Sequence, residues 1–161
     1  MRLLEASYVV KRIAPYYRNF GKRLVKAPKL YFLDTGLCAW LLEITSEQDM
    51  TLHYARGALF ETWAVVEALK WRAVRGDKQP IYFWRDNIGN EIDLLLEQNG
   101  GVTLVEVKSG KTYQDEWRRG LQVVERHLGF AVRKAVLYGG DSPQERQGTQ
   151  VLGWRDLRFA G

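Results

Sequence analysis

Residues 90–108, N-E-I-D-L-L-L-E-Q-N-G-G-V-T-L-V-E-V-K, constrain the fold of this chain most strongly, because they have the pattern of a β-hairpin. Two apolar runs are joined by the four residues from Gln98 to Gly101. The central Asn-Gly dipeptide favours a tight turn in which both residues take positive φ. Pairing outward from this turn places Leu96 opposite Thr103, so the turn predicts the register of the whole hairpin.

That register predicts an acidic pair at the far end of the hairpin. Because side chains alternate between the faces of a strand, one face is expected to carry Glu91, Asp93, Glu106 and Lys108, and the other Leu94, Leu96, Val105 and Val107. Asp93 and Glu106 then lie directly opposite each other, which destabilises a sheet by about 0.2–1 kcal/mol. A bound divalent cation would offset the repulsion. Alternatively, this is a solvated face on which Glu91 pairs with Lys108.

A third carboxylate is expected on the helix that precedes the hairpin. Residues 57–72 have a continuous apolar arc at helical spacing, and Glu61 lies in the middle of it. A carboxylate buried there without a partner would be costly. Glu61 therefore either points into a polar site or forms a salt bridge with Arg85 or Lys108.

The remaining pattern gives the fold class. From residue 57 onward the chain predicts a helix, three strands, a helix and two strands, at 57–72, 79–85, the hairpin, 112–128, 134–138 and 150–154. This αβββαββ order predicts an α/β or α+β fold with a central mixed sheet.

Residues 1–50 predict a separate, basic segment that resembles the wing of a winged-helix module. The end of a helix at 3–6 is followed by strands at 8–13 and 29–33, and then by a helix at 35–43 with Asp34 as its N-cap. Leu37, Trp40, Leu41 and Ile44 form one apolar stripe of this helix. Residues 44–55 are the expected linker to a second domain at 56–161. The abrupt start suggests part of a longer protein.

The positive charge of the chain is concentrated in this first segment. The net charge is +5, yet residues 1–33 carry eight basic residues and one acidic residue, which leaves the rest at −2. A basic patch is the footprint of a polyanion such as DNA, although a solvated surface is the alternative. The candidate DNA-binding residues are Lys11, Arg12, Arg18, Lys22, Arg23 and Lys26.

The spacing D-x(12)-E-V-K, with an upstream helical Glu, resembles the PD-(D/E)XK nuclease superfamily, whose fold is a restriction-endonuclease-like αβββαβ core. Further phrases resemble one prokaryotic family within it, an uncharacterised domain C-terminal to AAA+ ATPases. They are K-A-P-K-L-Y-F-L-D-T-G-L, G-A-L-F-E-T, F-W-R-D-N-I-G-N-E-I-D-L-L-L and L-V-E-V-K-S-G. The sequence departs from the superfamily pattern at Ile92, where a proline often precedes the Asp.

The resemblance implies a metal-dependent nuclease that hydrolyses DNA with a metal-activated water, fused to an ATPase outside this chain. Asp93, Glu106 and the Val107 carbonyl would hold Mg²⁺ or Mn²⁺, with Glu61 as a further ligand. Lys108 would position or help deprotonate the attacking water, and Gln122 would be an auxiliary polar residue. The alternatives are a catalytically inactive nuclease-fold module that binds nucleic acid or a protein partner, and an interaction domain of the ATPase.

Several other site types are not expected. The single cysteine, Cys38, excludes a disulfide framework and suggests a reducing cytoplasm. It has no zinc-ligand spacing with His53 or His127. No signal peptide opens the chain, and no apolar run reaches the ~18 residues of a membrane span.

No nucleotide site is expected either. Residues 110–112 read G-K-T, but a phosphate-binding loop needs glycine at Val105. Trp63, Trp71 and Trp84 are interpreted as core or interface residues rather than base-stacking platforms.

Overall fold

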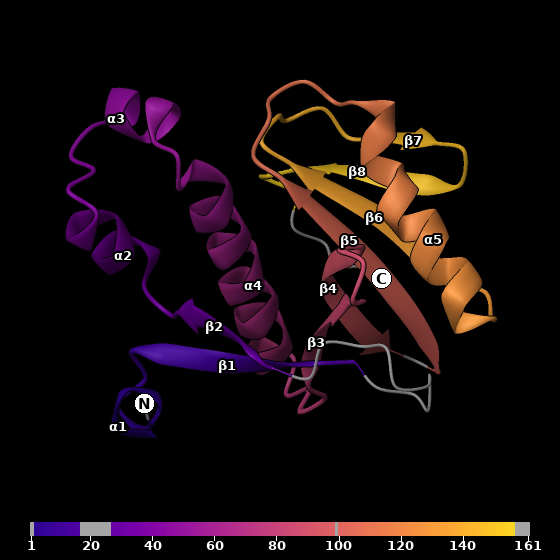
Figure 1. Cartoon of the computed structure of the whole chain (residues 1–161), viewed down its shortest axis with the longest axis horizontal. Helices are drawn as coiled ribbons and strands as arrows, with labels where there is room; N and C mark the ends of the chain where they lie inside the picture. The colour runs from indigo at the N-terminus through magenta and orange to yellow at the C-terminus, as the bar shows by residue number, and fades with distance from the viewer. Residues whose placement is uncertain (1, 17–26, 99, 157–161) are drawn as a thin grey trace.

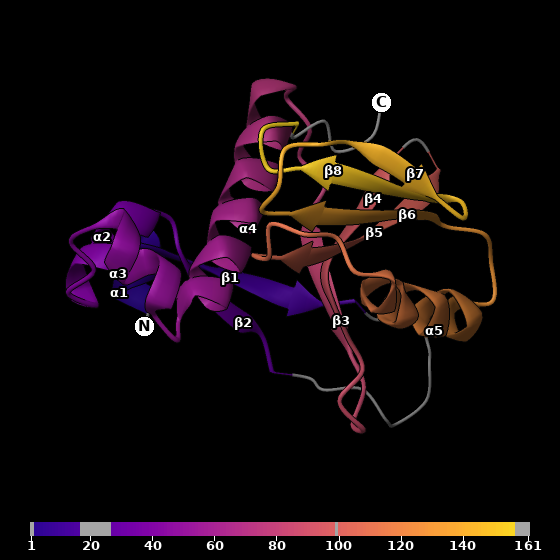
Figure 2. The same cartoon turned by 90° about the horizontal axis from the view of Figure 1, so that it is seen from above.

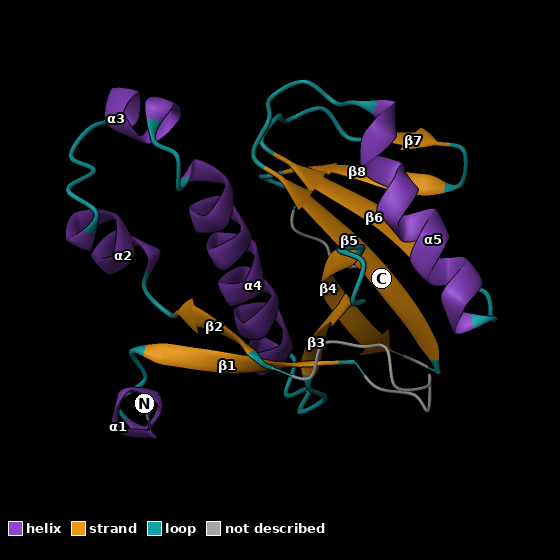
Figure 3. Cartoon of the chain, in the orientation of Figure 1, coloured by secondary structure: helices purple, strands orange, loops and turns teal. Residues whose placement is uncertain are grey.

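The computed structural model describes residues 2–16, 27–98 and 100–156. Figure 3 distinguishes the helices from the strands. The helices are α1 (Arg2–Ala6), α2 (Thr35–Leu41), α3 (Glu47–Leu52), α4 (Arg56–Val74) and α5 (Arg119–Leu128), with a short 3₁₀ helix, η2 (Asp115–Arg118), before α5. The strands are β1 (Val10–Pro15), β2 (Lys29–Phe32), β3 (Ile81–Arg85), β4 (Glu91–Gln98), β5 (Gly101–Lys108), β6 (Arg133–Tyr138), β7 (Gln144–Arg146) and β8 (Thr149–Gly153).

The strands form one mixed sheet in the order β2-β1-β3-β4-β5-β6-β8-β7. β1 is parallel to β3, and β5, β6 and β8 are parallel to one another, whereas the other neighbours are antiparallel. Helix α4 covers one face of the sheet and α5 the other (Figures 1 and 2). The predicted α+β class with a central mixed sheet is confirmed.

Helices α4 and α5 each cover a separate apolar core, one on each face of the sheet. Leu94, Leu96, Val105 and Val107 pack towards α4, as the predicted face required, whereas Ile92, Leu95 and Leu104 pack towards α5. Trp84 is fully buried on the α5 side. Trp63 and Trp71 are partly buried against the α4 core. The interpretation of these tryptophans as core residues is therefore confirmed for Trp84.

The hairpin β4–β5 has the predicted register, with Leu96 opposite Thr103 and Leu94 opposite Val105. Where β4 pairs with its other neighbour, β3, it contains a bulge. Tyr82 of β3 pairs with Leu95, but Trp84, two residues on, pairs with Ile92, three residues back along β4. One extra residue in β4 interrupts the alternation of its side chains.

The bulge corrects the prediction that four charged residues share one face. Asp93 and Glu91 turn towards α4 and the β2 residue Lys29, to which both are paired. Glu106 instead pairs with Lys108 and approaches Gly120 of α5. The four residues thus form two ion-paired groups, Glu91 and Asp93 with Lys29 and Glu106 with Lys108, although the charges of Asp93 and Glu106 still interact.

The first segment joins the same sheet. β1 pairs antiparallel with β2 and parallel with β3, through Ala14–Tyr82 and Pro15–Phe83. Asp34 caps α2 as predicted, accepting a hydrogen bond from Leu37 N–H at 3.0 Å. Most of the expected apolar stripe is exposed, with Trp40 at 72%, whereas Ile44 is half-buried and lies beyond the end of α2. Within the expected linker, residues 47–52 form α3 behind the N-cap Ser46.

Two further observations concern the predicted loops and membrane segments. β7 lies inside the predicted loop 139–148, because Gln147 and Gly148 both take positive φ and close a two-residue hairpin turn onto β8. No helix among the described residues is long and apolar enough to cross a membrane.

Candidate functional site

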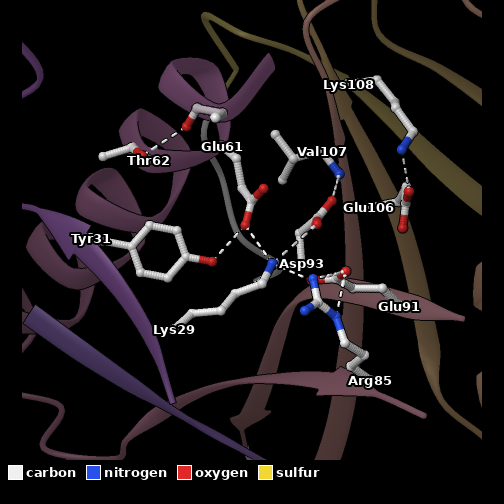
Figure 4. A network of polar contacts seen from close by, with 11 residues as sticks. Lys29, Tyr31, Glu61, Thr62, Arg85, Glu91, Asp93, Glu106, Val107 and Lys108 are labelled. Atoms are coloured by element: carbon white, nitrogen blue, oxygen red, sulfur yellow. Dashed lines mark hydrogen bonds and ion pairs between the residues drawn. The ribbon is translucent and has the colours of Figure 1, made fainter. Parts of the chain in front are cut away.

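Lys29, the first residue of β2, lies among three carboxylates that come from α4 and β4 (Figure 4). Its Nζ is 2.7 Å from Glu61 Oε1 and 3.9 Å from Asp93 Oδ1, and it also forms an ion pair with Glu91 Oε1. We call these four residues the Lys29 cluster. Although burial opposes the charge, Glu61 and Glu91 raise the pKa of Lys29, so its ammonium stays protonated.

Glu61 obtains both of its partners from β2. Tyr31, two residues after Lys29 and therefore on the same face of the strand, donates its hydroxyl to Glu61 Oε1 at 2.5 Å. Burial and the charge of Glu61 raise the pKa of Tyr31 well above its usual value. The predicted salt bridge of Glu61 with Arg85 or Lys108 is wrong. Among the described residues, Glu61 instead contacts Lys29 and Tyr31, because β2 lies against α4 at this point.

Glu91 is neutralised from two sides. Arg85 Nε donates to Glu91 Oε2 at 2.8 Å, and Arg85 Nη2 contacts the same oxygen. Burial would raise the pKa of Glu91, but the hydrogen bonds from Lys29 and Arg85 outweigh it and lower that pKa. The alternative in which Glu91 pairs with Lys108 is also wrong, because the bulge turns Glu91 towards Lys29.

Asp93 is the most deeply buried carboxylate of the Lys29 cluster. It is 9% exposed, and its Oδ2 accepts a hydrogen bond from Val107 N–H at 2.8 Å. Burial, followed by the charges of Glu106 and Glu61, raises the pKa of Asp93 to about 7. Asp93 therefore exchanges a proton near neutral pH, where an ordinary aspartate is fully ionised.

Glu106, on the neighbouring strand β5, is also 9% exposed, and one of its carboxylate oxygens has no hydrogen-bond partner among the described residues. Its Oε1 lies 2.5 Å from Lys108 Nζ, while Oε2 is buried with no hydrogen-bond donor among the described residues. Burial raises the pKa of Glu106 despite Lys108, and Glu106 in turn raises the pKa of Lys108. Lys108 is thus an ammonium ion in this arrangement and is suited to holding an anion or water.

Gly120 keeps open the space beside Glu106. A Cβ on Gly120 would lie 3.2 Å from the carbonyl oxygen of Glu91 and 3.8 Å from Glu106 Oε2. Helix α5 thus approaches the hairpin backbone so closely at Gly120 that a side chain there would be crowded. Gly120, Lys29 and Tyr31 are site residues that were not predicted from the sequence. For the β2 pair, the spacing K-x-Y on a strand was the available signal.

The other predicted residues lie outside this constellation. Gln122 is exposed on α5, and its carbonyl accepts from Arg126 Nε at 3.3 Å. Lys11 and Arg12 are exposed on β1, where Arg12 pairs with Glu5 at 2.7 Å. The predicted basic residues Arg18, Lys22, Arg23 and Lys26 fall outside the described residues.

The oxygen atoms of the site are suitable ligands for a hard divalent cation, but the ammonium group of Lys29 already lies among the carboxylates. Asp93, the unpartnered Oε2 of Glu106 and the Val107 carbonyl are all oxygen donors of the kind that Mg²⁺ and Mn²⁺ prefer. In residues 2–16, 27–98 and 100–156, no three His, Cys, Asp or Glu side chains are arranged to hold a metal. The ammonium of Lys29 occupies the position between Glu61, Glu91 and Asp93.

Comparisons with known proteins match the two parts of the chain separately. Residues 56–157 match the model of a domain of unknown function, DUF4143, and residues 1–48 match that of another, DUF8612. Two curated relatives are the uncharacterized proteins Rv2008c of Mycobacterium tuberculosis and Mb2031c of Mycobacterium bovis. Each is 31% identical over 138 residues, which cover 86% of this chain but 30% of the relative. The chain thus spans less than a third of their length. No solved structure matches.

Proposed function

The chain belongs to the family of the domain of unknown function DUF4143, and from the site that it carries we propose that this part of the protein is a metal-dependent nuclease domain. The proposed reaction is hydrolysis of a DNA phosphodiester bond by water with Mg²⁺ or Mn²⁺. We further propose that the domain works with an AAA+ ATPase module. The relatives contain more sequence than the 138 matched residues, so they have room for such a module.

The pair Asp93 and Glu106 carries the proposal. Both carboxylates are buried, both have raised pKa values, and the charge of Glu106 contributes to the raised pKa of Asp93. Burying two repelling acids destabilises a fold unless a cation accompanies them. A purely structural hairpin has no need of this pair, whereas a site for a divalent cation requires it.

Asp93, Glu106 and the carbonyl of Val107 would hold the ion, and Glu61 would join them if Lys29 moved away. Bound there, a divalent ion lowers the pKa of water and stabilises charge on the phosphate. Lys108 holds the substrate phosphate or the attacking water beside Glu106. As a ligand of that ion Asp93 would be ionised, whereas without the ion burial and neighbouring carboxylates raise its pKa to about 7.

The experiment is a cleavage assay with matched variants. Plasmid, single-stranded and branched DNA are incubated with the protein in Mg²⁺, in Mn²⁺ and in EDTA. Wild type should cleave only with metal, and Asp93→Asn and Glu106→Gln should each lose at least about a hundredfold in rate. Glu67→Gln is the control, because Glu67 pairs with Lys70 on the outer side of α4. Wild type without cleavage under any of these conditions would contradict the proposal.

One observation favours a second candidate, a nuclease-fold module without catalysis that binds nucleic acid or a protein partner. Lys29 and Arg85 already neutralise two of the three carboxylates of the Lys29 cluster, Glu61 and Glu91, without a metal. This candidate predicts that millimolar Mn²⁺ neither binds nor stabilises the protein, which separates it from the first.

A further inference from the structure

A cavity of about 510 Å³ lies beside the candidate site, between α2, α3, the amino-terminal half of α4 and the loops after β5, β6 and β8. The three strands are parallel, so their carboxyl ends meet at the same edge of the sheet, close to the start of α4 (Figures 1 and 2). The crevice at the carboxyl ends of parallel strands is where α/β sheets bind ligands. Its volume is within the range of about 300–1,000 Å³ of ligand sites.

Aromatic rings form one wall of this cavity. Phe60 and Trp63 of α4 lie with ring centroids 5.2 Å apart, and Trp63 meets Trp154, after β8, at 6.2 Å and an interplanar angle of 66°. Trp154 is 38% exposed, although the guanidinium of Arg155 lies 4.7 Å from the centre of its ring and covers part of it. A flat aromatic group is the kind of ligand that such a wall stacks against.

The charge of the lining is wholly positive. Arg56 and Lys111 line the cavity, and no carboxylate does. Arg56 is fixed in place, because it donates to the carbonyl of Ser109 at 2.7 Å and to that of Thr51 at 3.3 Å. Lys111 is exposed on the loop after β5. An occupant with an aromatic ring and a negative charge therefore complements this lining.

Two residues that line the cavity are adjacent in sequence to residues of the candidate site. Ser109, in the cavity wall, directly follows Lys108, and Phe60 directly precedes Glu61. Arg56 in the lining also holds the residue after Lys108, through the Ser109 carbonyl at 2.7 Å, so a ligand with a ring in the cavity has its anionic part near Arg56, Lys111 and the chain next to Lys108. A nucleotide unit of a polynucleotide strand has these two parts.

We propose that the cavity lined by Trp63 and Trp154 receives an unpaired base of a nucleic acid strand, next to the phosphate held at Lys108. This inference rests on the proposed function, since it takes the substrate to be DNA, and it specifies the substrate class. A base in a duplex is stacked and paired and cannot enter, so the domain selects single-stranded or frayed DNA. Stacking on tryptophan is tolerant of sequence, because every base has a π face.

The test measures binding without cleavage, by fluorescence anisotropy of labelled 12-nucleotide DNA in EDTA. The ligands are a single strand, the same strand with abasic positions, a blunt duplex and, as competitor, a free mononucleotide. Wild type should bind the single strand on the order of tenfold tighter than the abasic strand or the duplex. Equal affinity for the three DNAs would overturn the inference, and so would a mononucleotide that competes as well as the strand.

Matched variants locate the binding site. Trp154→Ala should weaken single-strand binding on the order of tenfold, and Lys111→Gln, an exposed change that leaves the fold intact, should weaken it several-fold. Trp40→Ala is the control, because Trp40 is 72% exposed on α2 outside the cavity. Equal affinities for Trp154→Ala and Trp40→Ala would overturn the inference. Tight single-strand binding without any cleavage in metal would contradict the proposed nuclease alone.

Discussion

Lys29 Nζ lies 2.7 Å from Glu61 Oε1, so a residue of the second strand neutralises a carboxylate of the long helix α4. The same ammonium contacts Glu91 and lies 3.9 Å from Asp93. Lys29 therefore serves as an internal cation in the part of the site where the proposed metal-binding residue Glu61 also lies. An added divalent cation must compete with it.

Replacing Lys29 by Met should increase the affinity for Mn²⁺ on the order of tenfold, because it removes a competing positive charge beside three carboxylates. Without metal, the same change should lower the free energy of unfolding by about 3 kcal/mol, since the side chain is 19% exposed and its loss leaves carboxylates without their partner. Isothermal titration with Mn²⁺ and urea denaturation in EDTA measure the two effects.

The control for Lys29→Met is Lys70→Met. Lys70 also pairs with a glutamate of α4, at 2.7 Å, but its side chain is 64% exposed. An exposed pair of this kind contributes about 0.5 kcal/mol or less. If the two variants lose the same stability, Lys29 is not an internal cation of a buried site.

Tyr31→Phe should lower the free energy of unfolding by about 1.5–3 kcal/mol, because it removes a hydrogen bond to the charged Glu61 and leaves the packing of the ring unchanged. Tyr8→Phe, at a residue that is 81% exposed, should change it by less than about 0.5 kcal/mol. Urea denaturation of both variants at pH 8 checks this. A Tyr31→Phe protein as stable as wild type would show that Glu61 depends on Lys29 alone.

Asp93→Asn should alter the pH dependence of stability. The pKa of Asp93 is raised from 3.8 to about 7 in the folded protein. Between these values the folded state binds more protons than the unfolded state, so this group's contribution to stability falls as pH rises. In EDTA at pH 8, the Asn variant should therefore be more stable than wild type, by up to about 4 kcal/mol, and this advantage should shrink towards pH 4. Denaturation curves with a pH-independent difference would contradict the raised pKa.

Local sequence signals predicted the features of the fold that depend only on neighbours in the chain. The Asn-Gly turn gave the register that sets Leu96 opposite Thr103, and the cap at Asp34 follows from the residue type alone. Both features are decided within a few residues, where turn and capping chemistry act.

The contacts that complete the site depend on distant pairing. Lys29 and Tyr31 reach Glu61 only because β1 pairs with β3 through two residue pairs and carries β2 along the α4 face. The bulge that turns Asp93 towards α4 has no glycine within it and arises from the pairing of β4 with β3. The bulge leaves no signal that a single sequence reveals, whereas the K-x-Y spacing indicates only that Lys29 and Tyr31 share a face of the strand, not which residue they contact.

Gly120→Ala should be less stable than Gly57→Ala by about 1–2 kcal/mol, because the new Cβ would lie 3.2 Å from the carbonyl oxygen of Glu91 and would crowd α5 against the hairpin. Gly57→Ala, in α4, is the control. A Cβ there meets nothing within 4 Å, so alanine should stabilise the helix by up to about 0.5–1 kcal/mol. Thermal denaturation of the two variants gives the comparison. Equal melting temperatures would show that α5 is not held against the hairpin at Gly120.

The most direct measurement is of Mn²⁺ at Asp93 and Glu106, by anomalous scattering from crystals soaked in Mn²⁺, for wild type and Asp93→Ala. The account predicts an anomalous peak between these two carboxylates in wild type and none in the variant, with Lys29 displaced from Asp93. Wild-type crystals in millimolar Mn²⁺ that show no peak, and in which Lys29 still joins Glu61, Glu91 and Asp93, would contradict a metal-dependent site in this domain.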